Sequence, residues 1–74
     1  MTLAYARVGK TYRIVKICGD DKARRRLIDM GFTPKCKITT EFISPFGKTT
    51  VVGLRDFRVA IRSDAADLIE IEEA

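Results

Sequence analysis

Residues 27–34 read LIDMGFTP, and this stretch decides the fold because it ends a helix and leads into a strand. Gly31 tolerates the left-handed conformation that often follows the last helical residue, and Pro34 cannot continue a helix. We expect Leu27 and Met30 to hold the helix against the core of the domain. All of these roles are structural, so the stretch identifies a fold more securely than a function.

The helix that precedes this stop is expected at residues 22–30. Asp20 or Asp21 stands before it, where a carboxylate caps free backbone N–H groups and favours the positive end of the helix dipole. The expected apolar stripe of the helix consists of Ala23, Leu27 and Met30, with Ile28 beside it. Beyond the helix, Phe32 is expected to return to the core.

Five further segments are rich in β-branched and aromatic residues, which favours strands. They are residues 12–17, 37–44, 49–55, 57–62 and 68–72. In the first segment Ile14, Val15 and Ile17 cannot all face one side, so we expect a bulge or burial on both faces.

The three middle segments alternate between apolar and polar residues, as half-buried strands do. The residues expected to face the core are Ile38, Thr40 and Phe42, then Thr50, Val52 and Leu54, then Phe57, Val59 and Ile61. Residues 45–48 predict a turn, and Ser63 is a candidate N-cap for one helical turn through Asp67.

These elements predict a single domain over residues 1–74. The expected fold class is mainly β: an SH3-like small β-barrel of about five strands, with one inserted helix and a short helical turn before the last strand. A closed barrel would also remove the exposed edges that so small a sheet otherwise presents.

Charge is divided along the chain, although the net charge is only +4. Residues 1–62 hold all fourteen lysines and arginines and five acidic residues, which gives +9. The last twelve residues hold five acidic residues and no basic one. We therefore expect a basic body and an acidic terminal strand, which folding can bring together.

The N-terminal residues and the length of the apolar runs indicate the cellular location of the protein. No apolar run approaches the roughly 20 residues that span a bilayer, and the N-terminal residues do not resemble a signal peptide. We expect a cytoplasmic protein without direct membrane insertion, in which Cys18 and Cys36 are free thiols. The sequence leaves the oligomeric state open.

The residues that commonly carry catalysis or hold metals are scarce. Histidine is absent, no base is suggested for Ser44 or Ser63, and the Gly-Lys-Thr at residues 47–49 lacks the upstream glycine of a phosphate-binding loop. Cys18 and Cys36 are too few for a thiolate metal site and fit small buried apolar residues better. We expect no catalytic residue, no cofactor and no bound metal.

Several parts of the chain together resemble the ferrous iron transport protein A (FeoA) family. Residues 27–34 resemble its pattern L-x-x-M-G-hydrophobic-x-P, and residues 58–66 (RVAIRSDAA) resemble its basic strand and following turn. Residues 14–17 and the arginines at 24–26 extend the likeness, which runs from about Thr11 to Ile71.

Two glycine-containing turns depart from the family's pattern. Family members often have Pro-Gly where this chain has Pro34-Lys35, and again where it has Val8-Gly9. At the first of these positions the glycine is replaced, so a different backbone geometry is expected there.

The resemblance implies a non-enzymatic accessory protein of bacterial ferrous iron uptake, which acts by contact with the FeoB-type GTP-binding transporter. It also implies recruitment to the inner face of the membrane by that partner. Two alternatives stay open: a basic small-barrel protein that binds nucleic acid, and a metal-responsive regulatory domain. The second is kept because the same fold forms the C-terminal domain of certain metal-dependent repressors. Nucleic acid is disfavoured because the aromatic residues do not interleave with the basic ones.

Five residues are candidates for partner contact: Arg24, Arg25, Pro45, Phe46 and Arg55. The arginines at 24–26 have three interpretations. They form a solvated helix face paired with Asp21 and Asp29, they bind an acidic surface of a partner, or one of them is donated to a GTPase active site. Phe46 fits either a cover over the barrel end or an apolar anchor for a partner.

Overall fold

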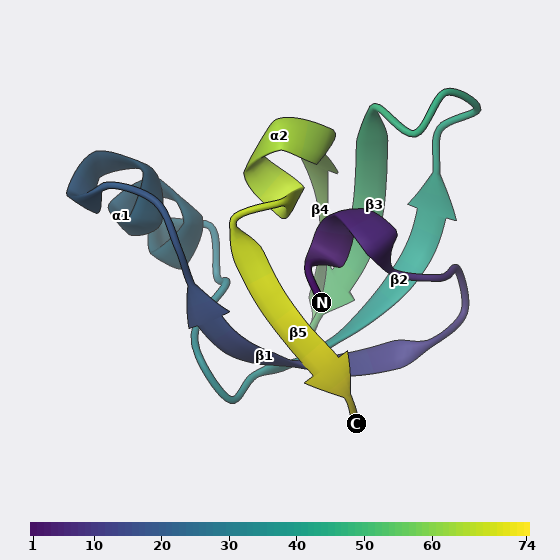
Figure 1. Cartoon of the computed structure of the whole chain (residues 1–74). Coiled ribbons are helices and arrows are strands. Elements are labelled where there is room, and N and C mark those ends of the chain that lie inside the picture. Colours follow the sequence, from purple (N-terminus) through teal and green to yellow (C-terminus); the bar gives the residue numbers. More distant parts are fainter.

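Five antiparallel strands form one curved sheet in the computed structural model, which describes all of residues 1–74 (Figure 1). The strands are β1 (Thr11–Ile17), β2 (Lys37–Ile43), β3 (Thr49–Leu54), β4 (Phe57–Arg62) and β5 (Ile69–Glu73). Helix α1 (Asp21–Asp29) follows β1, helix α2 (Ser63–Ala66) joins β4 to β5, and a 3₁₀ turn, η1 (Leu3–Tyr5), precedes β1. The mainly β, SH3-like class expected from the sequence is confirmed.

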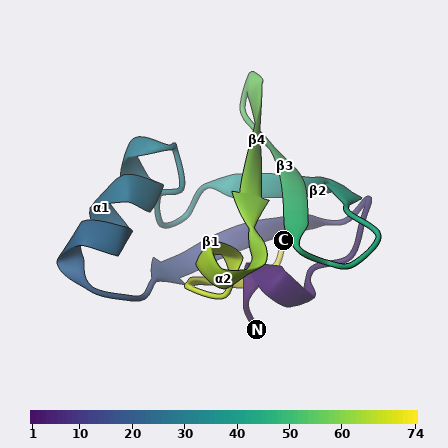
Figure 2. The ribbon, with the colours of Figure 1, turned by 90° about the horizontal axis from the view of Figure 1, so that it is seen from above.

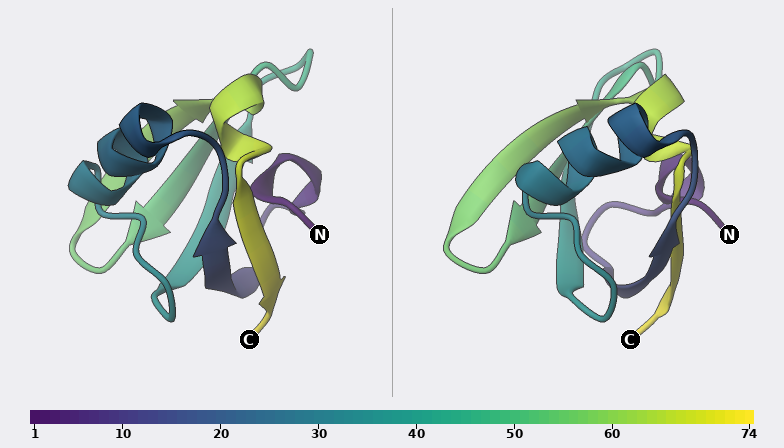
Figure 3. Two further views of the ribbon diagram at one scale, coloured as in Figure 1. Left: turned by 60° about the vertical axis from the view of Figure 1, so that its left-hand side comes forward. Right: turned by 90° about the vertical axis from the view of Figure 1, so that its left-hand side faces the viewer.

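The sheet has the order β4-β3-β2-β1-β5, and its two edge strands do not pair with each other. Figure 3 shows β4 and β5 on opposite sides of the curved sheet, with α1 across the open side. The expectation of a closed barrel without edges is therefore wrong in its strict form. Each edge strand therefore has unpaired backbone N–H and C=O groups, which must be covered or left exposed to solvent.

A single apolar core fills the concave side of the sheet. Its fourteen buried residues are Leu3, Ala6, Tyr12, Ile14, Ile17, Leu27, Phe32, Ile38, Val52, Leu54, Ile61, Ala66, Ile69 and Ile71. Strand β3 contributes as expected, because Thr50, Val52 and Leu54 are all buried. Phe32, just beyond the helix stop, is fully buried as its place in the sequence predicted.

Bulges decide which side chains of β1 and β2 reach this core. The pairing of β1 with β5 shifts register between Ile14 and Lys16, which confirms the expected bulge and leaves Val15 exposed. A second shift, between Thr40 and Phe42, was not expected. It turns Phe42 outward, where 54% of the residue is exposed, so the prediction that Phe42 faces the core is wrong.

Strand β4 is less buried than its alternating sequence predicted. Ile61 is buried, but Val59 is only partly so and Phe57 is exposed. The alternation is correct, and the edge position explains the lower burial because no strand covers the far side of β4.

Helix α1 begins and ends one residue earlier than the expected residues 22–30, but its cap and its stop are those that the sequence predicted. The Asp20 carboxylate accepts a hydrogen bond from Ala23 N–H at 2.8 Å. At the other end Gly31 N–H donates to Ile28 O and Phe32 N–H donates to Leu27 O, the paired bonds of a Schellman motif. Gly31 has φ of 108°, which strongly favours glycine.

Two expectations about the helix stop and the turn after it fail: the role of Met30 and the changed backbone geometry at Lys35. Met30 is exposed and does not hold the helix to the core, so Leu27 alone does so from within α1. Lys35 takes φ of 74°, so the left-handed conformation that a glycine would favour persists without one.

The basic body and the acidic terminal strand meet along β1 and β5. Lys10, just before β1, is paired with Glu73, while Arg13 faces Glu72 at 3.6 Å and Lys16 faces Glu70 at 3.8 Å. The charge division in the sequence thus becomes a row of exposed ion pairs between two neighbouring strands.

The N-terminal segment takes a role that the sequence did not reveal. Leu3 and Ala6 are buried in the core, and Thr2 forms an isolated antiparallel bridge to Glu70. Ile71 N–H donates to Met1 O at 2.8 Å, so this segment covers part of the outer edge of β5.

The short helix α2 starts one residue earlier than expected. Arg62 is its N-cap, without a capping bond from its side chain, so the assignment of Ser63 as the N-cap is wrong. Ala66 is buried and fastens α2 over the core.

Candidate interaction surface

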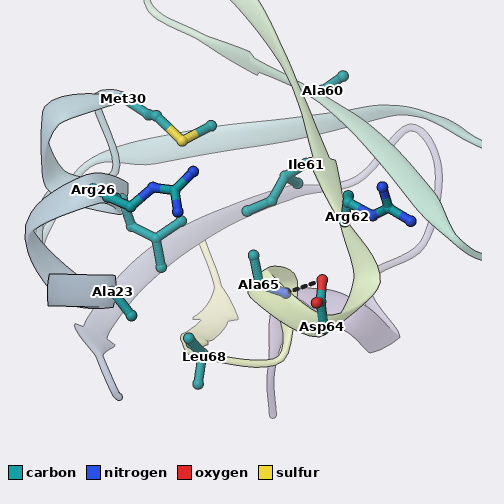
Figure 4. Close-up of a pocket in the computed structure, with 10 residues that line it drawn as sticks. Ala23, Arg26, Met30, Ala60, Ile61, Arg62, Asp64, Ala65 and Leu68 are labelled. Carbon is teal, nitrogen blue, oxygen red and sulfur yellow. Dashed lines mark hydrogen bonds between the residues drawn. The ribbon is translucent and has the colours of Figure 1, made fainter. Parts of the chain in front are cut away.

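A groove of about 350 Å³ lies between helix α1, the free edge of β4 and helix α2 (Figure 4). Its ten lining residues are Ala23, Arg26, Leu27, Met30, Ala60, Ile61, Arg62, Asp64, Ala65 and Leu68. Seven of the ten are apolar, so the groove offers an apolar floor beside charged groups. We call it the α1–β4 groove.

The α1–β4 groove exists because α1 is held loosely against the sheet. Leu27 is the one buried residue among the nine of α1. Two lining residues, Ala23 and Ala65, are too small to fill the space between the elements. In Figure 4 the Met30 side chain lies along one side of this space, and Ile61 points across it toward α1.

Arginines dominate the charge around the groove. Neither Arg26 nor Arg62 has an acidic side chain within 4.0 Å. The Asp64 carboxylate lies beside them but accepts a hydrogen bond from Ala65 N–H at 2.8 Å, which fixes it at the start of α2. The groove therefore presents an apolar floor with uncompensated positive charge nearby.

The contact candidates on α1 lie beside the groove and not in it. Arg24 Nε donates to Ile17 O at 3.2 Å, and an Arg24 guanidinium nitrogen lies 3.8 Å from an Asp21 oxygen. Part of its role is therefore to tie the start of α1 to β1. Arg25 makes no ion pair and borders a separate shallow depression with Asp21, Arg24 and Ile28. Asp29 has no basic partner, so the expected pairing of the arginine run is realised only at Asp21.

Pro45 and Phe46 lie at the tip of the β2–β3 turn. Phe46 is 89% exposed, so it does not fold over the end of the sheet. Ser44 Oγ accepts hydrogen bonds from Lys48 N–H and Thr49 N–H, which order the turn beneath the ring. Figure 2 shows this turn on the side of the molecule opposite α1.

Arg55 lies in a third place, near Cys36 in the turn before β2. One Arg55 guanidinium nitrogen is 3.7 Å from Cys36 Sγ, and Thr33 Oγ1 is 2.8 Å from the same sulfur. The hydrogen bond from Thr33 lowers the pKa of the Cys36 thiol, with a smaller contribution from Arg55 and against the effect of burial.

The cysteines depart from the sequence expectation in one respect. Cys36 is partly buried and packs against the core, but Cys18 is exposed, so the prediction of two small buried residues fails for Cys18. No three histidine, cysteine, aspartate or glutamate side chains lie together in a way that could hold a metal ion.

The five candidate residues are thus divided among three places and form no common site. The α1–β4 groove was not foreseen, since its walls come from residues about forty positions apart in sequence. The small residues Ala23 and Ala65, close to arginines, are the only local signal that could have pointed to it.

The sheet order, the single inserted helix and the open groove define this chain as a small SH3-like β domain. The family model for the FeoA domain matches residues 1–73, and the chain belongs to the FeoA family. No curated protein gives a significant match. No helix of the structure is long and apolar enough to cross a membrane.

Solved structures agree with this assignment. An FeoA-like protein from Clostridium acetobutylicum is 25% identical, with a TM-score of 0.90 over 99% of this chain and 85% of the other. Iron(II) transport protein A from Clostridium thermocellum is 28% identical, with a TM-score of 0.94 over 100% of this chain and 46% of the other.

A third structure shares the fold at lower identity. The FeoA of Stenotrophomonas maltophilia, solved with zinc and described as an SH3 domain protein, is 21% identical. Its TM-score is 0.84, over 97% of this chain and 89% of the other. This likeness supports the SH3-like description of the fold.

Proposed function

We propose that this protein is a non-enzymatic, cytoplasmic accessory protein of bacterial ferrous iron uptake, which acts by binding a FeoB-type transporter. The observation that carries the proposal is the FeoA domain match over residues 1–73. The likeness to iron(II) transport protein A from Clostridium thermocellum, at 28% identity, points the same way.

The geometry supports action by contact. An apolar groove with a few charged groups is a common form of binding site for another protein. The α1–β4 groove is open to solvent, and its two arginines have no acidic partners within the chain. A partner that supplies apolar and acidic groups would satisfy both features.

Binding to the intact transporter is the direct test. The FeoB-type transporter of the same genome is reconstituted in nanodiscs, and its binding to this protein is measured by biolayer interferometry. We expect Arg26→Glu, which reverses a charge in the groove, to weaken binding by about tenfold or more. Uptake of radioactive ferrous iron by cells that carry the same variant should fall in parallel.

Arg25→Glu is the matched control, because it makes the same charge change on the same helix outside the groove. We expect it to change binding by less than about threefold. Equal losses for the two variants would place the contact on the arginine run as a whole. Absence of any binding by the unaltered protein would refute the proposal.

A further inference from the structure

We infer that the free edge of β4, beside the α1–β4 groove, binds an extended segment of the partner as an added strand, and that this segment alternates acidic and apolar residues. The inference rests on the proposed function, because it names the chemistry of the transporter segment that would bind. Three features of the β4 edge lead to it: its backbone groups, its groove and its charges.

The backbone of β4 offers unpaired hydrogen-bonding groups along its outer edge. Ser63 N–H donates to Lys48 O at 2.9 Å, which sets the alternation of bonds between β3 and β4. By that alternation Phe57, Val59 and Ile61 bond to β3, while Arg58 and Ala60 direct N–H and C=O outward. No hydrogen bond outside β3 uses the backbone of either residue.

The groove lies where alternate side chains of an added strand would point. Ile61 points into the α1–β4 groove, whereas Arg62 lies at the rim of the groove and directs its side chain to the other side of β4 (Figure 4). Side chains of a paired strand follow the same alternation as their neighbours. Every second residue of the incoming segment would therefore enter the groove beside Ile61 and Met30, which calls for apolar residues at those positions.

The charges on β4 determine which residue types suit the remaining positions of the incoming segment. On the outer face of β4, Arg58 Nε already lies 2.6 Å from Glu41 Oε1, whereas Arg62 has no acidic side chain within 4.0 Å. Arg26, on the α1 side of the groove, is also unpaired. Opposite charges on adjacent strands stabilise the pair, and like charges destabilise it. A carboxylate facing Arg62 thus completes the pattern, and further acidic residues on the same face suit the surrounding basic residues.

The chain contains an example of this pairing in its own sheet. Strand β5 reads Ile-Glu-Ile-Glu-Glu, and it pairs with the basic strand β1 through Arg13–Glu72 and Lys16–Glu70. A second copy is a poorer occupant of the β4 edge. Two β4 strands side by side would bring Arg58 and Arg62 of one copy close to those of the other.

The test uses a defined probe, the capped heptapeptide Glu-Ile-Glu-Leu-Glu-Ile-Glu, titrated to about 1 mM into the ¹⁵N-labelled full chain. We expect the amide signals of Ala60, Arg62 and Ala65 to shift. A peptide with lysine at each glutamate should bind at least about tenfold more weakly. A peptide N-methylated at alternate bonds should bind at least about fivefold more weakly, because it lacks the strand hydrogen bonds.

Variants of the chain add an independent measurement. Ala60→Pro removes the outward N–H of Ala60, and proline is tolerated where an edge-strand N–H faces outward. Ala60→Val is its control, since it adds similar bulk and keeps the N–H. Only the proline variant should lose peptide binding, with melting curves recorded for both. The N-methylated peptide decides the question if Ala60→Pro fails to fold.

Each outcome bears on the inference. Shifts confined to β1 and β5, equal binding of the N-methylated peptide, or no shift at all would overturn it. A concentration-dependent dimer that uses the same amides would overturn the partner assignment in favour of a second copy. If the acidic peptide does not compete with transporter binding, the proposed function stands, but the β4 edge is excluded as the contact. If the protein binds the peptide but not the transporter, the β4 edge stands as a strand-binding site and the proposed function is refuted.

Discussion

The two edges of the sheet differ in how their unpaired backbone groups are treated. The outer edge of β5 is covered in part by the N-terminal segment, through the Thr2–Glu70 bridge and the bond from Ile71 N–H to Met1 O. The edge of β4 has no strand beside it, and α1 stands next to it with a groove between them. One edge is closed by the chain itself, and the other is left available.

This difference shows what an open edge requires in so small a domain. An unpaired strand invites aggregation unless it is short, charged or covered. Strand β4 has six residues and carries two arginines on its outer face: Arg58, which is paired with Glu41, and the unpaired Arg62. The unpaired charge of Arg62 disfavours pairing with a second β4 strand. The same Arg62 favours an acidic strand, so protection and recognition depend on the same residue.

The largest expected effect concerns the attachment of α1, which forms the far wall of the β4 edge. Leu27→Ala removes the only buried side chain of that helix, and we expect the free energy of unfolding to fall by about 3 kcal/mol. Urea denaturation followed by circular dichroism measures this. Ile28→Ala, on the exposed side of the same helix, should cost less than about 1 kcal/mol. Equal costs would mean that α1 is not held by Leu27.

The next effect concerns the link between the end of α1 and the start of β4. A side chain at Gly31 would need φ of 108° and would lie 2.9 Å from the ring of Phe57, so Gly31→Ala should cost about 1–2 kcal/mol. Gly9→Ala is the control, because Gly9 also has a φ beyond the left-handed region that other residues adopt, at 87°, but no neighbour within 4 Å. The difference between the two variants in urea denaturation isolates the contact with Phe57. If both cost the same, the ring does not restrain the helix end.

A smaller effect is expected at the closed edge. Thr2 Oγ1 donates to Asp67 Oδ1 at 2.9 Å, and Thr2→Ala should lower the free energy of unfolding by about 0.5–1 kcal/mol. Native-state hydrogen exchange should show faster exchange at Ile71 N–H, which the N-terminal segment covers. Exchange at the β3–β4 bonds should not change. Uniform acceleration would mean that the two edges open together and are not independent.

The parts of this structure set by neighbouring residues could be predicted from the sequence. The helix stop at Gly31, the return of Phe32 to the core and the bulge at Val15 follow from local patterns of glycine, proline and β-branched residues. The pairing of the acidic terminal strand with a basic strand could also be expected, because the last twelve residues carry acidic residues and no basic one.

The failures came from tertiary contacts. Phe42 faces outward because β2 shifts register against β3, and the alternation of β2 alone does not reveal that shift. Met30 was expected in the core, but α1 stands off the sheet and leaves it lining the groove. The groove itself needed α1, β4 and α2 to be placed in space, and no pattern within a single segment encodes that placement.

The smallest expected effect is electrostatic and belongs to the β5 side of the sheet. The hydrogen bond and charge of Lys10 lower the pKa of the Glu73 carboxyl below its usual range in the folded protein. A carboxyl with a depressed folded-state pKa adds stability above its unfolded pKa, and this stability is lost as pH falls through the folded pKa. Glu73→Gln should therefore lower the urea midpoint slightly at pH 7 and leave it unchanged at pH 2.

Both groups of this pair are exposed, so added salt should also reduce the difference between Glu73→Gln and the unaltered protein at pH 7. Lys10→Met removes the other partner and should reproduce the same pH dependence, whereas Arg26→Glu, beside the open edge, should not alter the acid limb. A pH-independent loss in Glu73→Gln would assign Glu73 a packing role. The row of ion pairs between β1 and β5 would then align the strands without setting their response to acid.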